Sequence, residues 1–132
     1  MVKNSIFLLM LLAVFLSACQ ANGPSTQLRV ELNDFAITPN QLTVPASSEI
    51  KIKIANAGAV VHNFYILKYG VEVGEQFDED DISNALWEAE VQPDDTATFD
   101  FMAPDQPGMY QIVCGMPGHL EAGMVGTLKV IR

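Results

Sequence analysis

The sequence contains few cysteines, few basic residues and no hydrophobic run long enough to span a bilayer comfortably. Two cysteines in 132 residues exclude a disulfide-rich scaffold. Seven Lys and Arg stand against sixteen Asp and Glu, a net charge of −9. Without a basic stripe to neutralise phosphates, nucleic-acid binding is excluded. The longest apolar run, Ile6 to Leu16, is too short for a comfortable membrane span.

This apolar run belongs to an N-terminal pattern that predicts a targeting signal. Lys3 supplies a thin positive region, and Leu16-Ser17-Ala18-Cys19 follows the run as a small-residue cleavage site. A cysteine at this place matches the lipobox of bacterial lipoproteins. We therefore predict a lipoprotein signal peptide over residues 1–18 and lipidation of Cys19. The alternative is an ordinary secretory peptide that leaves Cys19 as a free thiol, a reactive liability outside the cell.

Residues 19–27 are small and polar and include a Gly-Pro pair, which is typical of a flexible tether. The predicted location is extracytoplasmic, on a lipid anchor in the bacterial cell membrane, at its periplasmic side or at the cell surface. Removal of the predicted signal peptide, which contains Lys3, leaves six basic and sixteen acidic residues, a net charge of −10. Twelve of the acids lie between Glu72 and Asp105. Such a patch can steer basic partners or simply keep the protein soluble, and both interpretations stay open.

From Leu28 onward, apolar and polar residues alternate with the period of two that half-buried strands show. The clearest cases are EIKIKI at 49–54, with its isoleucines facing inward, and TATFDF at 96–101, which is expected to bury Ala97, Phe99 and Phe101. Further candidates cover 28–32, 42–44, 63–67, 109–114 and 127–131. About seven or eight short strands without heptads predict an all-β Greek-key sandwich, in one domain over residues 28–132.

One segment departs from this alternation. Between Gly74 and Pro93 an acidic start precedes Ile82, Ala85, Leu86 and Ala89, which are spaced by three and four residues. We therefore expect a short inserted helix over 82–89, capped by Asp80 or Asp81. Trp87 is expected to anchor that helix against the sandwich rather than to relay electrons.

Three metal donors lie at even spacing near the C-terminal end: Cys114, His119 and Met124. The glycines and the proline between them predict a loop joining two strands. Such a loop can direct all three donors to one metal ion only if a fourth donor comes from elsewhere in the chain. His62, the only other histidine, is the candidate for this fourth donor. Each residue alone has an ordinary explanation, as a strand-end histidine, a core-filling methionine or a buried cysteine. Their joint occurrence predicts a site for one thiophilic metal ion.

The stretch CGMPGH at 114–119, followed by Met124 and preceded by His62-Asn63, resembles the cupredoxins, with a loop spacing of the auracyanin and azurin types. The resemblance implies one mononuclear type 1 copper, with Met124 as its weak axial ligand. It also implies that the Asn63 side chain ties two strand ends together while its backbone N–H donates to the Cys114 sulfur. His119 would be the ligand at the solvent edge, with Leu120 beside it in an exposed apolar docking patch to which 57–61 contributes.

The function that this resemblance implies is electron transport rather than catalysis, since multicopper enzymes need more histidines than the two present. A membrane-anchored monomer would exchange one electron through Cu(I)/Cu(II) with redox proteins such as c-type cytochromes or membrane electron-transfer complexes. The alternative is an extracytoplasmic copper carrier or store. Sites of that kind tend to be rich in methionine and open, whereas only Met124 stands at ligand spacing here.

Overall fold

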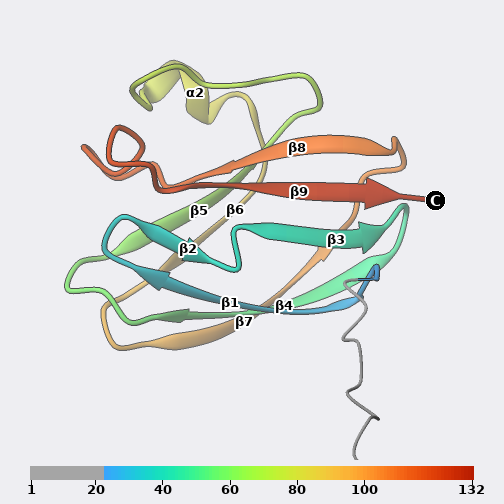
Figure 1. Ribbon diagram of the computed structural model, residues 1–132, viewed down its shortest axis with the longest axis horizontal. Helices are drawn as coiled ribbons and strands as arrows, with labels where there is room; N and C mark the ends of the chain where they lie inside the picture. The colour runs from blue at the N-terminus through green and yellow to red at the C-terminus, as the bar shows by residue number, and fades with distance from the viewer. Residues whose placement is uncertain (1–22) are drawn as a thin grey trace, which may run out of the picture.

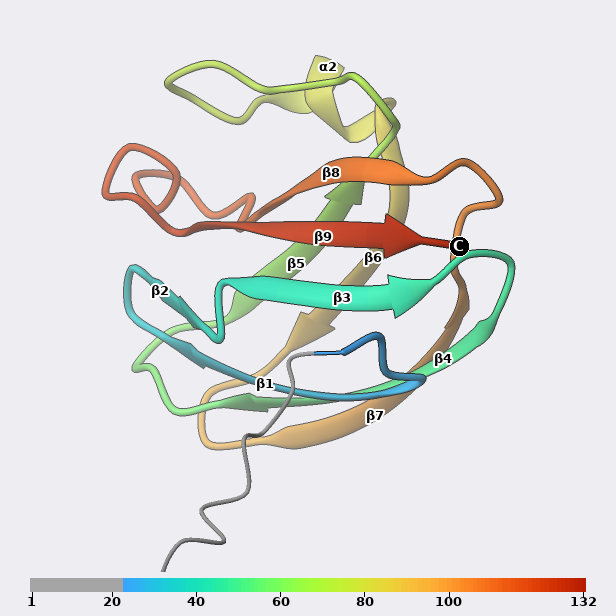
Figure 2. The ribbon, with the colours of Figure 1, turned by 45° about the vertical axis from the view of Figure 1, so that its right-hand side comes forward.

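The computed structural model describes residues 23–132 as two β-sheets packed face to face (Figures 1 and 2). The predicted signal peptide, Cys19 and residues 20–22 of the predicted tether lie outside the described residues. Within residues 23–132, no helix is both long and apolar enough to cross a membrane.

The first sheet has four strands in the order β2-β1-β4-β7. They are β1 (Gln27–Asn33), β2 (Ala36–Thr38), β4 (Glu49–Asn56) and β7 (Thr96–Met102). The second sheet has five strands in the order β3-β9-β8-β5-β6. They are β3 (Gln41–Pro45), β5 (His62–Leu67), β6 (Ala85–Val91), β8 (Gly108–Val113) and β9 (Val125–Ile131). Strand pairs β1/β4 and β3/β9 are parallel and the other pairs are antiparallel. Because consecutive strands often belong to different sheets, the chain crosses repeatedly between the sheets, as in a Greek-key sandwich.

The main core lies between the two sheets and follows the predicted alternation. In β4, Ile50, Ile52 and Ile54 are fully buried while the lysines between them face solvent. β7 is less buried than expected. Of its three inward side chains, Ala97, Phe99 and Phe101, only Phe101 is buried in the core. β5 differs from its neighbours because both of its faces are covered. Its outer face carries Tyr65 and Leu67, which form a second cluster beneath the connection that follows.

The predicted helix over 82–89 is wrong in position. The only helix among residues 23–132 is α2 (Glu79–Ile82), which ends where the predicted one begins and is capped by Asp78. The next residues form the edge strand β6, because Trp87, Ala89 and Val91 alternate inward and pair with β5. Ile82 and Leu86, counted toward the helical stripe, are 46% and 44% exposed.

Trp87 does serve as a packing residue, but from a strand. Its ring contacts Phe64, Phe99 and Phe101, with ring centroids 6.3, 5.9 and 5.0 Å away. Strand β2, which the sequence pattern did not indicate, is a three-residue edge strand that pairs with the end of β1.

The strands give the sandwich two distinct ends, visible in Figures 1 and 2. The β1–β2 turn, the β4–β5 loop that leads into His62, and the β8–β9 loop lie together at one end. The start of β1 and the C-terminus lie at the opposite end. The predicted metal donors therefore all belong to one end of the molecule.

Candidate metal centre

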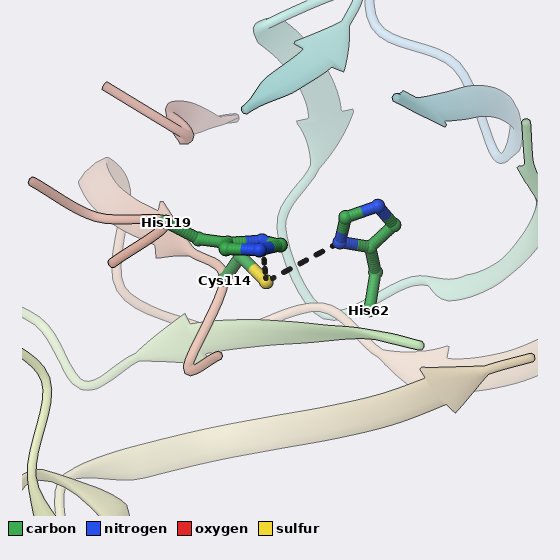
Figure 3. A group of neighbouring side chains, drawn as sticks. All are labelled: His62, Cys114 and His119. Carbon is green, nitrogen blue, oxygen red and sulfur yellow. Dashed lines mark hydrogen bonds between the residues drawn. The ribbon is translucent and has the colours of Figure 1, made fainter. Parts of the chain in front are cut away.

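His62, Cys114 and His119 meet in a buried cluster at this end of the sandwich (Figure 3). The Cys114 Sγ lies 3.8 Å from Nδ1 of His62 and 3.5 Å from Nδ1 of His119. All three donor atoms lie within 4.8 Å of one another. A point central to such a triangle is about 2.0–2.8 Å from each atom, which spans the usual metal–nitrogen and metal–sulfur bond lengths. The donors therefore fit one metal ion.

The loop between β8 and β9 closes on itself through backbone hydrogen bonds that hold its three donors. The Cys114 N–H donates to the Met124 carbonyl at 3.2 Å, and the Met124 N–H donates to the His119 carbonyl at 2.9 Å. Gly118 and Gly123 adopt φ of +82° and +93°, a region that other residues enter only with strain. Met124 is fully buried in the main core. Each donor in the loop is thus positioned by another donor's backbone.

The Cys114 sulfur is buried, which disfavours a free thiolate, but it accepts from two backbone N–H groups. Burial raises the pKa of the Cys114 thiol, and the backbone N–H groups of Met116 and Asn63, which donate to the sulfur, partly oppose that rise. A coordinating metal ion deprotonates such a thiol outright. The two N–H groups then stabilise the metal-bound thiolate.

His62 is fully buried at the first position of β5. Burial lowers the pKa of its imidazole, the nearby His119 lowers it further, and Asp34 opposes both effects. The ring is therefore neutral at physiological pH and can present a nitrogen lone pair to a metal. Its Nδ1 faces the Cys114 sulfur, and its Nε2 lies 3.4 Å from a carboxylate oxygen of Asp34.

His119 is the more solvent-accessible of the two histidines, as expected, but only 7% of it is exposed. The ring of Phe35 covers it, edge-on, with ring centroids 5.1 Å apart. Phe35 lies in the β1–β2 turn at a φ of +68° and is 51% exposed. Sequence reasoning missed Phe35 because an isolated aromatic residue in a turn, some eighty residues from the ligand that it covers, carries no local signal.

Two expectations about neighbouring residues are wrong. The Asn63 side chain does not tie the strand ends together, because it points outward and donates to Glu90 at 3.2 Å. The buried Asn56 makes a different link, between the β4–β5 loop and the end of β6, with Nδ2 donating to the carbonyls of Val60 and Val91. Leu120 is not part of a docking surface, because it is 9% exposed and packs in the second cluster.

The exposed apolar patch at this end is built partly by the residues that were expected. Phe35 and Val60, 51% and 41% exposed, are its large members. Val60 belongs to the predicted contributing run 57–61, whereas Phe35 comes from a different loop. His119 lies beneath the patch rather than at its centre.

Two histidines and one cysteine close together, with a buried methionine at the end of the same loop, form the donor set of a type 1 copper site. On a two-sheet Greek-key sandwich, this set defines a blue copper protein.

The chain belongs to the cupredoxin-like domain family, whose match spans residues 6–127. Its cofactor is copper, held by His62, Cys114, His119 and Met124. Auracyanin-B of Chloroflexus aurantiacus is 29% identical to it over 122 residues, which cover 80% of this chain and 52% of that protein. The chain therefore spans about half the length of this relative.

Solved structures give the same fold. The dithionite-reduced auracyanin of Roseiflexus castenholzii superposes with a TM-score of 0.72 at 27% identity, covering 83% of this chain and 100% of that one. Rusticyanin from Thiobacillus ferrooxidans superposes with a TM-score of 0.60 at 17% identity, covering 83% and 82% of the two chains. At this lower identity the similarity concerns the fold alone.

Proposed function

We propose that this protein is a one-electron carrier that works outside the cytoplasm, held at a bacterial membrane by a lipid on Cys19. The observation that carries the proposal is the buried cluster of His62, Cys114 and His119 on a closed loop and a strand end. Copper bound there would take up and release one electron by changing between Cu(II) and Cu(I). The four ligands and the residues that hold them in place are not expected to act on a chemical substrate.

The protein's part in electron exchange is to keep the ligands still. His62 is fixed by the pairing of β5 with β6, and Cys114 and His119 by their bonds with Met124 and Met116. Full burial of His62, Cys114 and Met124 keeps water out of the site. A site that changes little between two oxidation states presents a small barrier to electron transfer.

The same burial argues against the alternative of a copper carrier or store. A carrier must release its metal to a partner, which favours open sites with several methionines. Here the three donor residues of the cluster are buried. The remaining loop methionine, Met116, packs against the core with its backbone engaged to His119. Rapid transfer of the ion itself is therefore disfavoured.

We further propose that electrons pass through His119 and Phe35, and that the partner is basic, such as a c-type cytochrome. The connection between β5 and β6 carries exposed acids in the first turn of α2. It lies beside the copper loop, because Phe77 stacks on Tyr65 and a Cβ on Gly115 would lie 2.9 Å from Phe77. These acids can steer a positive partner toward the copper end.

Stopped-flow oxidation by a basic cytochrome, across a salt series, tests the partner. Glu79→Gln with Asp80→Asn removes two charges without touching the capping Asp78, and Glu49→Gln with Asp105→Asn removes two at the opposite end. Screening shortens from about 10 Å at 0.1 M salt to about 3 Å at 1 M. The first pair should lower the association rate and its salt dependence, and the control pair should not. Equal salt slopes in both pairs would reduce the acids to a solubility feature.

Lipidation is tested separately by growth with a labelled fatty acid. The parent protein should carry the label and partition with membranes. Cys19→Ser should lose the label and remain as uncleaved precursor or soluble protein. Label retained by the variant would exclude Cys19 as the anchor.

A further inference from the structure

The outer nitrogen of His62 is the one buried side-chain polar atom among residues 23–132 without a hydrogen-bond partner. The ring is fully buried, and its other nitrogen faces Cys114. The nearest acceptor is the Asp34 carboxylate, with Oδ1 at 3.4 Å from Nε2. This is slightly beyond the usual length of about 2.7–3.2 Å for an N–H···O bond.

The Asp34 carboxylate is held at this place by the protein. Both of its oxygens accept from the Ala59 backbone N–H, at 3.1 and 3.3 Å. The Ala57 N–H donates to the Leu32 carbonyl at 2.8 Å, which joins the β4–β5 loop to the end of β1. The two segments that carry Asp34 and lead into His62 are thus tied together.

Gly58 leaves the space that this contact needs. A Cβ at this position would lie 2.5 Å from Asp34 Oδ1 and 2.5 Å from His62 Nε2, closer than real Cβ atoms come. Its N–H donates to Oδ1 of the buried Asn56 at 2.9 Å, which fixes the glycine beside the pair. The carboxylate and the imidazole therefore meet in a gap that only a residue without a side chain leaves open.

We propose that Asp34 is a positioning residue for the metal centre, which accepts the Nε2–H of His62 and so keeps Nδ1 free for copper. Carboxylate–histidine–metal arrangements of this kind fix the tautomer and the ring orientation and strengthen the histidine as a ligand. The negative charge also favours Cu(II) over Cu(I). This inference rests on the copper site of the proposed function and adds a charged residue to it.

Two substitutions separate the two effects. Asp34→Asn removes the charge but keeps an oxygen that can accept from His62 and Ala59. Asp34→Ala removes both. Asp95→Asn is the matched control, because Asp95 lies at the same end, where its carbonyl accepts from the Asn56 N–H. The side-chain partners of His62 are Cys114 and Asp34, not Asp95.

The first measurement is the reduction potential of the copper protein. Asp34→Asn should keep the blue colour and change the ratio of Cu(II) to Cu(I) affinity about tenfold in favour of Cu(I), a rise of about 59 mV. Asp95→Asn should change it much less. Equal potentials in the two variants would overturn the electrostatic part of the proposal.

The second measurement needs no metal. In the metal-free protein at pH 8, long-range nitrogen NMR reports which His62 nitrogen carries the proton. The parent and Asp34→Asn should hold it on Nε2, and Asp34→Ala should show a mixture with Nδ1. An unmixed Nε2 proton in Asp34→Ala would overturn the positioning role. A parent protein that stays colourless with Cu(II) would refute the proposed function and leave this tautomer result to stand alone.

Discussion

Replacement of Phe35 by glycine should leave the protein about as stable as the parent, although it removes a large aromatic side chain. Phe35 has a φ of +68°, a conformation that costs an L-residue about 1–2 kcal/mol. Glycine relieves that strain but gives back about 0.4–1 kcal/mol through the freedom of the unfolded chain. The edge-on contact with His119 contributes about 0.5–1.5 kcal/mol. With mid-range values these contributions nearly cancel, and their extremes leave a net change between about +1.1 and −1.5 kcal/mol.

Phe35→Ala is the informative comparison, because it loses the ring contact and keeps the strained backbone. It should be less stable than Phe35→Gly by roughly 0.5–1 kcal/mol. Urea unfolding of the three metal-free proteins, followed by circular dichroism, measures the order. An alanine variant as stable as the glycine variant would refute the strain argument.

The same two variants test whether Phe35 shields the copper ligand. Since His119 is covered by this ring, both should lose their blue colour to an added copper chelator faster than the parent, and to the same extent. Phe35→Tyr keeps a ring and should behave as the parent does. Equal rates in all four proteins would show that the ring does not limit access to the metal.

The remaining predictions concern the ligands. Cys114→Ser should fold but lose the intense visible band, because only the thiolate supplies sulfur-to-copper charge transfer; an intensely blue variant would contradict the ligand assignment. Met124→Leu nearly conserves volume at a fully buried position and should cost less than about 1.5 kcal/mol. It should keep copper and raise the reduction potential in voltammetry, since loss of a weak donor destabilises Cu(II) more than Cu(I); complete loss of copper would instead indicate a carrier site. The His62 pKa is depressed in the folded state, so the metal-free protein should lose stability as the pH falls through and below about 6.5, where the unfolded chain takes up the proton first. Urea unfolding at pH 7.5 and 5.5 measures this loss, and a slope as steep in His62→Asn would contradict it.

The loop donors could be predicted from the sequence because they are contiguous. Cys114, His119 and Met124 share one short loop whose glycines and proline exclude regular structure, and His62 followed by elimination. The strands of the core could also be predicted wherever one face of the strand is exposed to solvent, as in β4. Both signals are local.

The features that were predicted wrongly or missed depend on which segments of the chain meet in the folded structure. ALWEAEV at 85–91 fits a helical and a strand period alike, and the pairing of β6 with β5 decides between them. Asp34 and Phe35 reach His62 and His119 only because the β1–β2 turn folds over the copper end. The direction of the Asn63 side chain likewise depends on Glu90 across the sheet.

The two ends of the sandwich have a geometric consequence for a tethered carrier. The first strand starts at the end opposite the copper, and a seven-residue strand such as β9 is about 23 Å long. With a lipid on Cys19 and a short tether, a domain whose long axis is perpendicular to the bilayer would hold its copper end away from the membrane. A water-soluble or protruding redox partner would meet the copper end directly. A partner whose redox centre is level with the lipid headgroups would be reached only after the domain tips onto its side, so tether length would then limit the rate of delivery.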